Sequence, residues 1–251
     1  MKAKQYIPMA VAGTLLLATA CVKDTLYNTP HPDYGAIVLL LDDSEDGEQY
    51  TVDIAGEKAD FSVSPYTFPA LLSSGTCRLT VYNRTAGFSF DGQTAQVNAL
   101  SGKSRADAPA IIPLPGYLKT FSREISVTAD DTLRVNVVPQ QRVRDLQLEL
   151  EITQGRPELI QSVTATLSGI AGAFDMEQGE TTGDATSTVF AFTREGSTLT
   201  AEARLLGTMG AVQMLVLDIV FTDGGRTQRT EVDLTEALAD FNGDMTTAYR
   251  V

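Results

Sequence analysis

The sequence of 251 residues predicts an all-β protein built from two tandem β-sandwich domains, with a short C-terminal helix. Short apolar or alternating runs of strand length recur along most of the chain. Clusters of Gly, Pro, Ser and acidic residues separate these runs, as expected for turns between antiparallel strands. Helical periodicity is confined to one segment near the carboxyl end. The hydrophobic share of 43% and the charged share of 20% are typical of a globular protein.

The amino terminus has the three parts of a secretory signal peptide. Lys2 and Lys4 give it a basic start, residues 7–17 are mostly apolar, and the small residues 18–20 precede Cys21. The apolar run is too short to span a bilayer, which takes about 20 residues. We therefore expect residues 1–20 to direct export and then to be removed.

The segment 17–21 resembles a bacterial lipobox, although Ala18 stands where leucine is commoner. This resemblance implies that Cys21 becomes the lipidated first residue of the mature chain, and that its acyl chains, palmitate among them, hold the protein to a membrane. The alternative is ordinary signal cleavage with Cys21 incidental. If Cys21 is lipidated, Cys77 has no disulfide partner and serves as a small apolar residue in a strand.

Residues 21–34 form the next element, a predicted extended tether between the lipid and the first strand. Asn28, Pro30 and Pro32 interrupt any periodicity there. The single histidine of the chain, His31, lies inside this tether, so we interpret it as a solvated linker residue.

The first β-sandwich domain is predicted over residues 35–139 and the second over 140–251, with the boundary near Pro139. Five runs open the first domain and two more complete it: 36–41, 50–54, 61–63, 77–82, 88–90, 124–128 and 132–138. Six runs form the second: 146–152, 162–167, 187–192, 198–206, 213–221 and 229–232. The segment 98–118 lacks a clear strand and is predicted to be a mobile loop or connector.

The short helix is predicted over residues 234–241. Asp233 can cap its amino end with Glu236 three residues on, and Leu234, Leu238 and Phe241 form one apolar face.

Composition excludes several functional classes. The net charge is −13, and removal of Lys2 and Lys4 with the signal peptide lowers it to −15, which disfavours nucleic acid and anionic lipid as partners. One histidine and two cysteines do not suffice for His-centred catalysis or a multi-His zinc site. The 32 acidic residues show no spacing that selects an acid and a base. We therefore predict no enzyme activity, no catalytic residues and no cofactor.

Two acidic turns invite a metal-site hypothesis. Asp42, Ser44, Asp46 and Gly47 echo the start of a calcium loop, with Asp53 at its twelfth position, but the flanking runs are strands and not EF-hand helices. The turn 240–244 contains Asn-Gly, which is itself a turn signal. We assign no metal to either turn. The glycine runs 169–172 and 207–210 match neither a phosphate-binding loop nor a dinucleotide motif and are interpreted as turns.

Three blocks of the mature sequence resemble the FimB-type fimbrial anchor subunits of Bacteroidales, which are fimbrillin-related outer-membrane lipoproteins. The first block is residues 21–33, where Lys23 and Asp24 also resemble a short surface-export signal. The second covers 69–76 with 79–83, and the third is 160–172. The resemblance implies two transthyretin-like β-sandwiches, exposure on the cell surface, the stalk subunit fimbrillin as partner, and a role in holding a pilus to the outer membrane.

The resemblance also implies a test of position within the pilus, because stalk subunits of this kind lose their first strand to an Arg- or Lys-specific protease. Between Lys23 and Lys58 the sequence contains neither residue. An uncut first strand, 36–41, favours a base anchor over a stalk subunit. The C-terminal segment 246–251 is then a candidate for strand donation to the first stalk subunit, with pairing inside its own sheet as the alternative.

A surface glycan-binding lipoprotein of a nutrient-uptake system is the competing hypothesis. Eight Tyr and ten Phe could supply faces on which sugars stack, although the chain has no Trp. We expect most of these aromatic rings to fill the sandwich cores.

Overall fold

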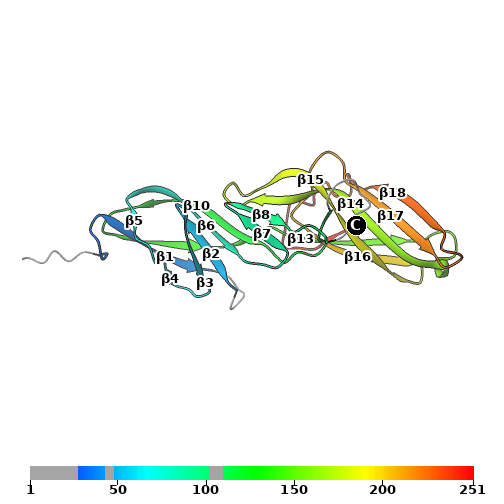
Figure 1. The fold of residues 1–251 in the computed structure, drawn as a ribbon, viewed down its shortest axis with the longest axis horizontal. Coiled ribbons are helices and arrows are strands. Elements are labelled where there is room, and N and C mark those ends of the chain that lie inside the picture. Colours follow the sequence, from blue (N-terminus) through cyan, green and yellow to red (C-terminus); the bar gives the residue numbers. More distant parts are fainter. Residues whose placement is uncertain (1–27, 43–47, 102–109) are drawn as a thin grey trace, which may run out of the picture.

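The computed structural model describes residues 28–42, 48–101 and 110–251. The molecule is elongated, with β1 in one half and β17 and β18 in the other (Figure 1). The predicted all-β, sandwich-like fold is confirmed. Across the described ranges the structure has no α-helix, only a single 3-10 turn, η1, at Pro157–Leu159.

The first half consists of two facing sheets. In one of them, β1 (Tyr34–Leu41) runs parallel to β11 (Thr132–Val137) and antiparallel to β4 (Tyr66–Thr67) and β5 (Leu72–Ser73). The facing sheet has the order β12 (Gln140–Gln141), β10 (Lys119–Val127), β6 (Gly75–Asn83), β2 (Tyr50–Ile54), β3 (Glu57–Phe61).

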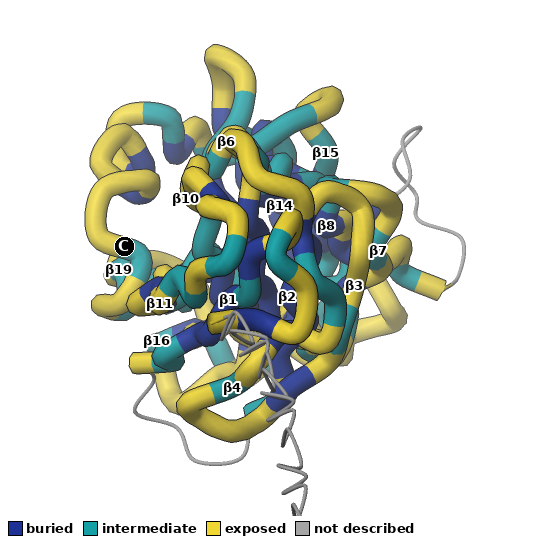
Figure 2. Tube along the Cα trace, turned by 90° about the vertical axis from the view of Figure 1, so that its left-hand side faces the viewer, coloured by how far each residue is buried: buried dark blue, intermediate teal, exposed yellow. Residues whose placement is uncertain are grey.

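The core of the first half lies between these sheets, because alternate residues of each strand point inward. Ile37 and Leu39 of β1 are fully buried against Tyr50, Leu79 and Val81 of the facing sheet. Figure 2, seen along the molecule, shows the buried residues gathered inside and the exposed loops around them.

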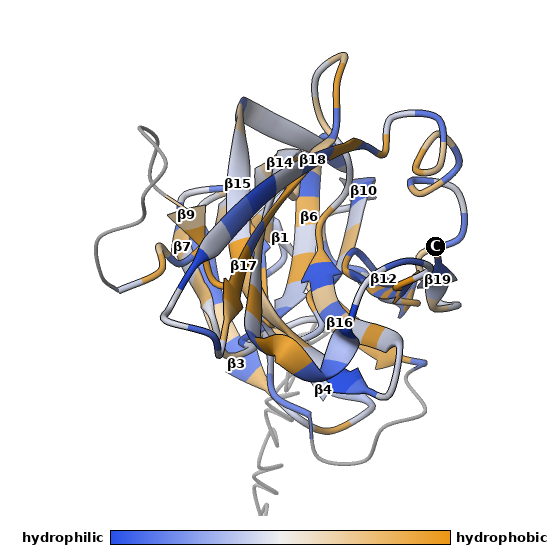
Figure 3. Cartoon of the chain, turned by 90° about the vertical axis from the view of Figure 1, so that its right-hand side faces the viewer, coloured by the Kyte–Doolittle hydropathy of each residue, from blue (hydrophilic) through white to orange (hydrophobic). Residues whose placement is uncertain are grey.

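The second half is an open ten-stranded sheet that folds over into two layers around a larger core. Its main path is β18 (Thr227–Asp233), β17 (Met214–Phe221), β14 (Ile160–Asp175), β15 (Glu180–Glu195), β16 (Thr198–Leu205), β13 (Arg144–Glu151), β19 (Tyr249–Arg250). Strand β15 pairs with β16 only over residues 193–195, so β16, β13 and β19 form an opposing layer. The edge strand β18 is mostly hydrophilic (Figure 3), which protects the edge from unwanted pairing.

Three strands from the middle of the chain complete the second sheet. The hairpin of β7 (Phe88–Asp91) and β8 (Thr94–Val97) pairs with β14, and β9 (Ala110–Ile111) pairs with β15. Phe88, Val97 and Ile111 accordingly belong to the second core. The local sequence pattern does not indicate that β7, β8 and β9 pair with the second sheet. A domain boundary near Pro139 stays a prediction.

Three local predictions are wrong. The glycine run 169–172 was interpreted as a turn, but it lies inside the strand β14. Residues 234–241 form successive turns and not a helix: one helical bond, from the Leu238 amide to the Leu234 carbonyl at 2.8 Å, is not continued. The segment 98–118 is not wholly a connector, since residues 110–111 form β9 and the Pro113 carbonyl accepts a hydrogen bond of 2.7 Å from the Arg204 amide. Residues 102–109 lie outside the described residues.

Among the described residues, no helix is long and apolar enough to cross a membrane.

Candidate functional site

The chain enters the first sheet through a clamp between Asn28–Thr29 and the turn that joins β10 to β11. The Asn28 amide donates to Asp130 Oδ1 at 2.7 Å, and its side-chain Nδ2 donates to the Asp130 carbonyl at 3.0 Å. The Thr29 amide also donates to Asp130 Oδ1, at 3.2 Å. Asp130 has a φ of +53°, a left-handed conformation that Asp tolerates better than most residues. One carboxylate therefore fixes the start of the described chain to a turn about a hundred residues later.

The clamp extends to the start of β1. Thr29 is buried, and its hydroxyl lies 2.6 Å from the His31 carbonyl and 3.1 Å from the Tyr34 carbonyl. The Asp130 amide donates to the Tyr34 carbonyl at 3.0 Å. The described part of the predicted tether is thus folded onto the domain. His31 is exposed, with its ring edge-on to Tyr34 at 4.8 Å between centroids, as expected of a linker residue.

Strand β1 is held on both edges. Six consecutive residue pairs, from Ala36–Thr132 to Leu41–Val137, join it in parallel to β11. Gly35 permits this approach, because a Cβ there would lie 2.5 Å from the Thr128 carbonyl oxygen. The strand that the sequence predicts to remain uncut is therefore an integral part of the first core.

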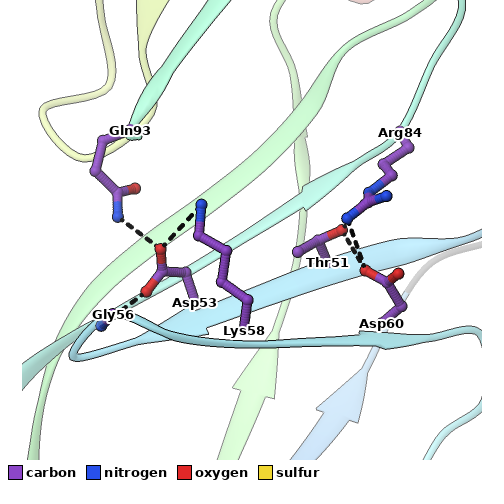
Figure 4. Close-up of polar contacts among 7 residues, drawn as sticks. All are labelled: Thr51, Asp53, Gly56, Lys58, Asp60, Arg84 and Gln93. Atoms are coloured by element: carbon purple, nitrogen blue, oxygen red, sulfur yellow. Dashed lines mark hydrogen bonds and ion pairs between the residues drawn. The ribbon is translucent and has the colours of Figure 1, made fainter. Parts of the chain in front are cut away.

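A buried carboxylate connects the two halves of the molecule (Figure 4). Asp53 on β2 accepts hydrogen bonds from the Gly56 amide at 3.0 Å and from Gln93 Nε2 at 3.1 Å, and Lys58 Nζ lies 3.5 Å away. Gln93 belongs to the turn between β7 and β8, which pair with the second sheet. The partners of Asp53 in the structure are thus amides and an ammonium. Residues 43–47 of the echoed calcium loop lie outside the described residues.

The C-terminal segment is docked in its own sheet. Tyr249 and Arg250 pair in parallel with β13, and the Val251 amide donates to the Gln147 carbonyl at 3.0 Å. Of the two alternatives for segment 246–251, pairing within its own sheet is the arrangement seen in this structure.

Arg144 organises the approach to this last strand. It is buried, and its guanidinium donates to the Thr247 carbonyl at 2.7 Å and to the Phe241 carbonyl at 2.6 Å. The same group lies over the rings of Phe241 and Tyr249, at 5.5 and 4.7 Å from their centroids. In the turn 240–244, Asp244 accepts hydrogen bonds from the hydroxyls of Thr246 and Thr247, and the bond from Thr246 is the main reason that the pKa of Asp244 falls to about 2.

The aromatic residues offer no open stacking face in the described part of the chain. Most are buried or half-buried in the two cores, as expected, and only Tyr34 and Tyr117 are exposed. Tyr34 packs against His31. The ring of Tyr117 is covered by the Arg204 guanidinium at 4.1 Å, and its hydroxyl donates to Asp145 at 2.6 Å, which raises the pKa of Tyr117. A sugar site of the stacked-aromatic kind has no support here.

The remaining candidates from the sequence are the two cysteines and the possible metal ligands. Cys21 lies outside the described residues, so its lipidation stays a prediction. Cys77 is half-buried on β6 beside the first core, and burial raises the pKa of its thiol. In the described ranges, no three His, Cys, Asp or Glu side chains cluster as metal ligands.

Sequence reasoning missed the two organising residues, Asp130 and Arg144. The only local signal for Asp130 is the Asp-Asp turn between two strand-like runs. Arg144 has none, because its partners follow about a hundred residues later in the chain.

No protein-family model matches the chain, and no curated protein matches its sequence. Solved structures do resemble it. A candidate adhesin from Bacteroides ovatus is 15% identical, with a TM-score of 0.69 over 89% of this chain and 90% of that one. The fimbrial anchor protein Mfa2 from Porphyromonas gingivalis is 11% identical, with a TM-score of 0.57 over 86% of this chain and 88% of Mfa2.

A Bacteroides thetaiotaomicron protein described as a candidate polysaccharide-binding protein is 9% identical, with a TM-score of 0.55 over 86% of this chain and 88% of that one. At these identities the likeness concerns the fold. The chain therefore shares, over most of its length, the all-β fold of Bacteroidales adhesin-type and fimbrial anchor proteins.

Proposed function

We propose that this protein is a non-enzymatic, surface-exposed lipoprotein that anchors a fimbria to the outer membrane through lipidated Cys21. The observation that carries the proposal is the continuous set of contacts that leads from Asn28, where the described chain starts, into the first sheet. The clamp of Asn28 and Thr29 on Asp130 leads directly into β1, which pairs with strands on both edges. Because residues 24–57 contain no Lys or Arg, a basic-specific protease has no cutting site around this strand.

The shared fold with Mfa2, which is itself named a fimbrial anchor, supports the same proposal. In our proposal the second half engages the stalk subunit fimbrillin by a strand-mediated contact. The candidate segment is 246–251, because only its last three residues bond to the backbone of β13, and a chain end can be exchanged at low cost.

The test is the retention of fimbriae by cells that express variants of the protein. Cys21→Ala should release both protein and fimbriae into the medium, whereas Cys77→Ala, the matched control, should leave both attached. Deletion of residues 246–251 should release fimbriae while the lipoprotein stays in the membrane fraction. Fimbriae of normal length on cells that lack the whole gene would overturn the anchor proposal. Release by Cys21→Ala but not by the deletion would reject only the proposed contact segment.

A further inference from the structure

The two glycine runs, 169–172 and 207–210, meet in the second half of the molecule. The Met209 amide donates to the Gly169 carbonyl at 2.8 Å, and the Ala171 amide donates to the Gly207 carbonyl at 3.0 Å. Gly169 has a φ of +73°, and a Cβ on it would lie 2.1 Å from the Val212 carbonyl oxygen. Only glycine at 169 therefore lets the loop 207–213 close against β14.

Buried and reciprocal polar contacts fix this loop. The Gln213 side chain is buried, and its Nε2 lies 3.3 Å from the carbonyl oxygens of both Gly169 and Gly210. Asn242 accepts a hydrogen bond from the Thr208 amide at 2.8 Å and returns one to the Thr208 carbonyl at 3.3 Å. The loop is thus built as a rigid wall, which lowers the cost of ordering it around a ligand.

Between this wall and the outer face of β14, β15 and β17 lies a cavity of about 650 Å³, within the size range of small-molecule sites. Hydroxyl groups of Thr166, Ser168 and Ser187 line it on the strands. Met209 and Val212 of the loop, with Val216 of β17, supply apolar surface.

The Ser187 side chain is the main indication that this cavity binds a ligand. It is 5% exposed, and its Oγ has no hydrogen-bond partner among the described residues. A buried hydroxyl without a partner is costly, and a bound polar group would satisfy it. Its neighbour across the ladder, Ser168, makes only a long contact of 3.4 Å to the Met214 carbonyl.

The charges at the cavity disfavour an anionic ligand. Asp218 and Arg229 both line it, and they stand directly opposite each other in the pairing of β17 with β18. Arg229 also lies 3.8 Å from the Glu231 carboxylate, so acidic groups offset its positive charge. The Asp218 carboxylate can only accept hydrogen bonds, and the guanidinium can only donate them. Hydroxyl groups of a ligand can do both.

We propose that this cavity binds a neutral saccharide unit. Ring hydroxyls bond to Ser168, Ser187 and the Asp218–Arg229 pair, and the C–H faces of the ring pack on Met209, Val212 and Val216. The proposal goes beyond anchoring and does not depend on it.

The test is a titration of the soluble chain from residue 22 onward with maltotriose, cellotriose, mannotriose and chitotriose, followed by amide chemical shifts. At least one trisaccharide should give saturable shifts at Ser168, Ser187 and Val212, with a Kd of roughly 1 mM. Absence of saturable shifts for all four at ~20 mM, more than tenfold above that Kd, would overturn the proposal. Chemical-shift changes that map only to residues outside the cavity would also overturn it. The same holds if the tripeptide Gly-Gly-Gly binds in the cavity and none of the four sugars does.

Two conservative variants make the test specific. Ser187→Ala and Asp218→Asn each remove hydrogen-bonding capacity with little change of volume, so each should weaken binding about tenfold. Asp91→Asn, at an exposed carboxyl of β7 that does not line the cavity, should bind like the wild type. Unchanged affinity in both cavity variants, with unchanged thermal unfolding, would contradict the assignment.

Discussion

Gln93 donates a hydrogen bond of 3.1 Å to the buried carboxylate of Asp53, and this bond joins the first sheet pair to the hairpin of the second sheet. Lys58 lies next to the contact (Figure 4), and Asp53 is on the face of β2 opposite to Val52 and Ile54, which belong to the first core. It is a specific polar link between two halves that otherwise have separate hydrophobic cores.

We predict that Asp53→Ala lowers the free energy of unfolding by about 2 kcal/mol, because it leaves the Gly56 amide and the Gln93 amide group without their acceptor. Glu231→Ala is the comparison. That carboxylate is 62% exposed and pairs with the exposed Arg229 at 3.8 Å, so its loss should cost under about 1 kcal/mol. Urea denaturation measures both values. Equal losses of unfolding free energy in the two variants would show that the Asp53–Gln93 hydrogen bond stabilises the fold no more than a surface ion pair does.

The clamp at the amino end gives a second prediction. Asp130→Ala removes the acceptor of the Asn28 and Thr29 amides and places alanine at a φ of +53°. We expect faster hydrogen exchange at the Thr29 amide and a loss of stability of at least about 1 kcal/mol.

Asp130→Gly separates the two causes, because glycine accepts the backbone conformation but offers no carboxylate. It should expose the Thr29 amide as fully as alanine does, with a smaller loss of stability. A Thr29 amide that stays protected in both variants would mean that the carboxylate does not hold the segment.

The third prediction concerns Arg144. Lysine keeps the charge but cannot reproduce the forked donors or the ring contacts, so Arg144→Lys should loosen residues 246–251. Hydrogen exchange at the Val251 amide should rise, and stability should fall by about 2 kcal/mol. Arg123→Lys, at an exposed position on β10, is the control and should change neither value. If hydrogen exchange at the Val251 amide stays slow in Arg144→Lys, contacts other than those of Arg144 hold the last strand in place.

The fourth prediction follows from the depressed pKa of Asp244. Hydrogen bonds from Thr246 and Thr247 hold it at about 2, below the ordinary 3.8, so the ionised form is favoured in the folded state. The stabilisation is fully present above pH 3.8 and is lost as the pH falls through 2. The Thr246 amide shift should therefore titrate with a midpoint near pH 2, and Asp244→Asn should abolish that step. A midpoint near 3.8 would mean that these bonds do not form in solution.

Local patterns predicted several strands well, although the two longest, β14 and β15, have 16 residues each and were predicted only over 162–167 and 187–192. β2 has the bounds that its alternating, β-branched sequence indicates, and β11 and β16 end within one residue of theirs. The short strands β4, β5 and β12 were missed, because two residues carry no period. The attachment of β7–β9 to the second sheet was missed for another reason: strand partners distant in sequence leave no local signal.

The wrong helix at 234–241 has a clear physical cause. Leu234, Leu238 and Phe241 are buried together, so the apolar face was predicted correctly. In a helix the Phe241 amide would donate to the Ala237 carbonyl. That carbonyl accepts a hydrogen bond from the Tyr249 hydroxyl, and the Phe241 amide donates to the Leu238 carbonyl, three residues back. Tertiary contacts outcompete the weak helical preference of so short a segment.

The parallel pairing of β1 with β11 has a mechanical consequence. Both strands run in the same direction, so a pull on the amino end of β1 is resisted at the far end of β11, where the chain continues toward the second half. Tension along this route acts as shear on all six residue pairs at once, whereas an antiparallel hairpin pulled from its two open ends peels one pair at a time. A molecule held by its amino terminus and loaded through its second half would thus carry the force along its most resistant axis.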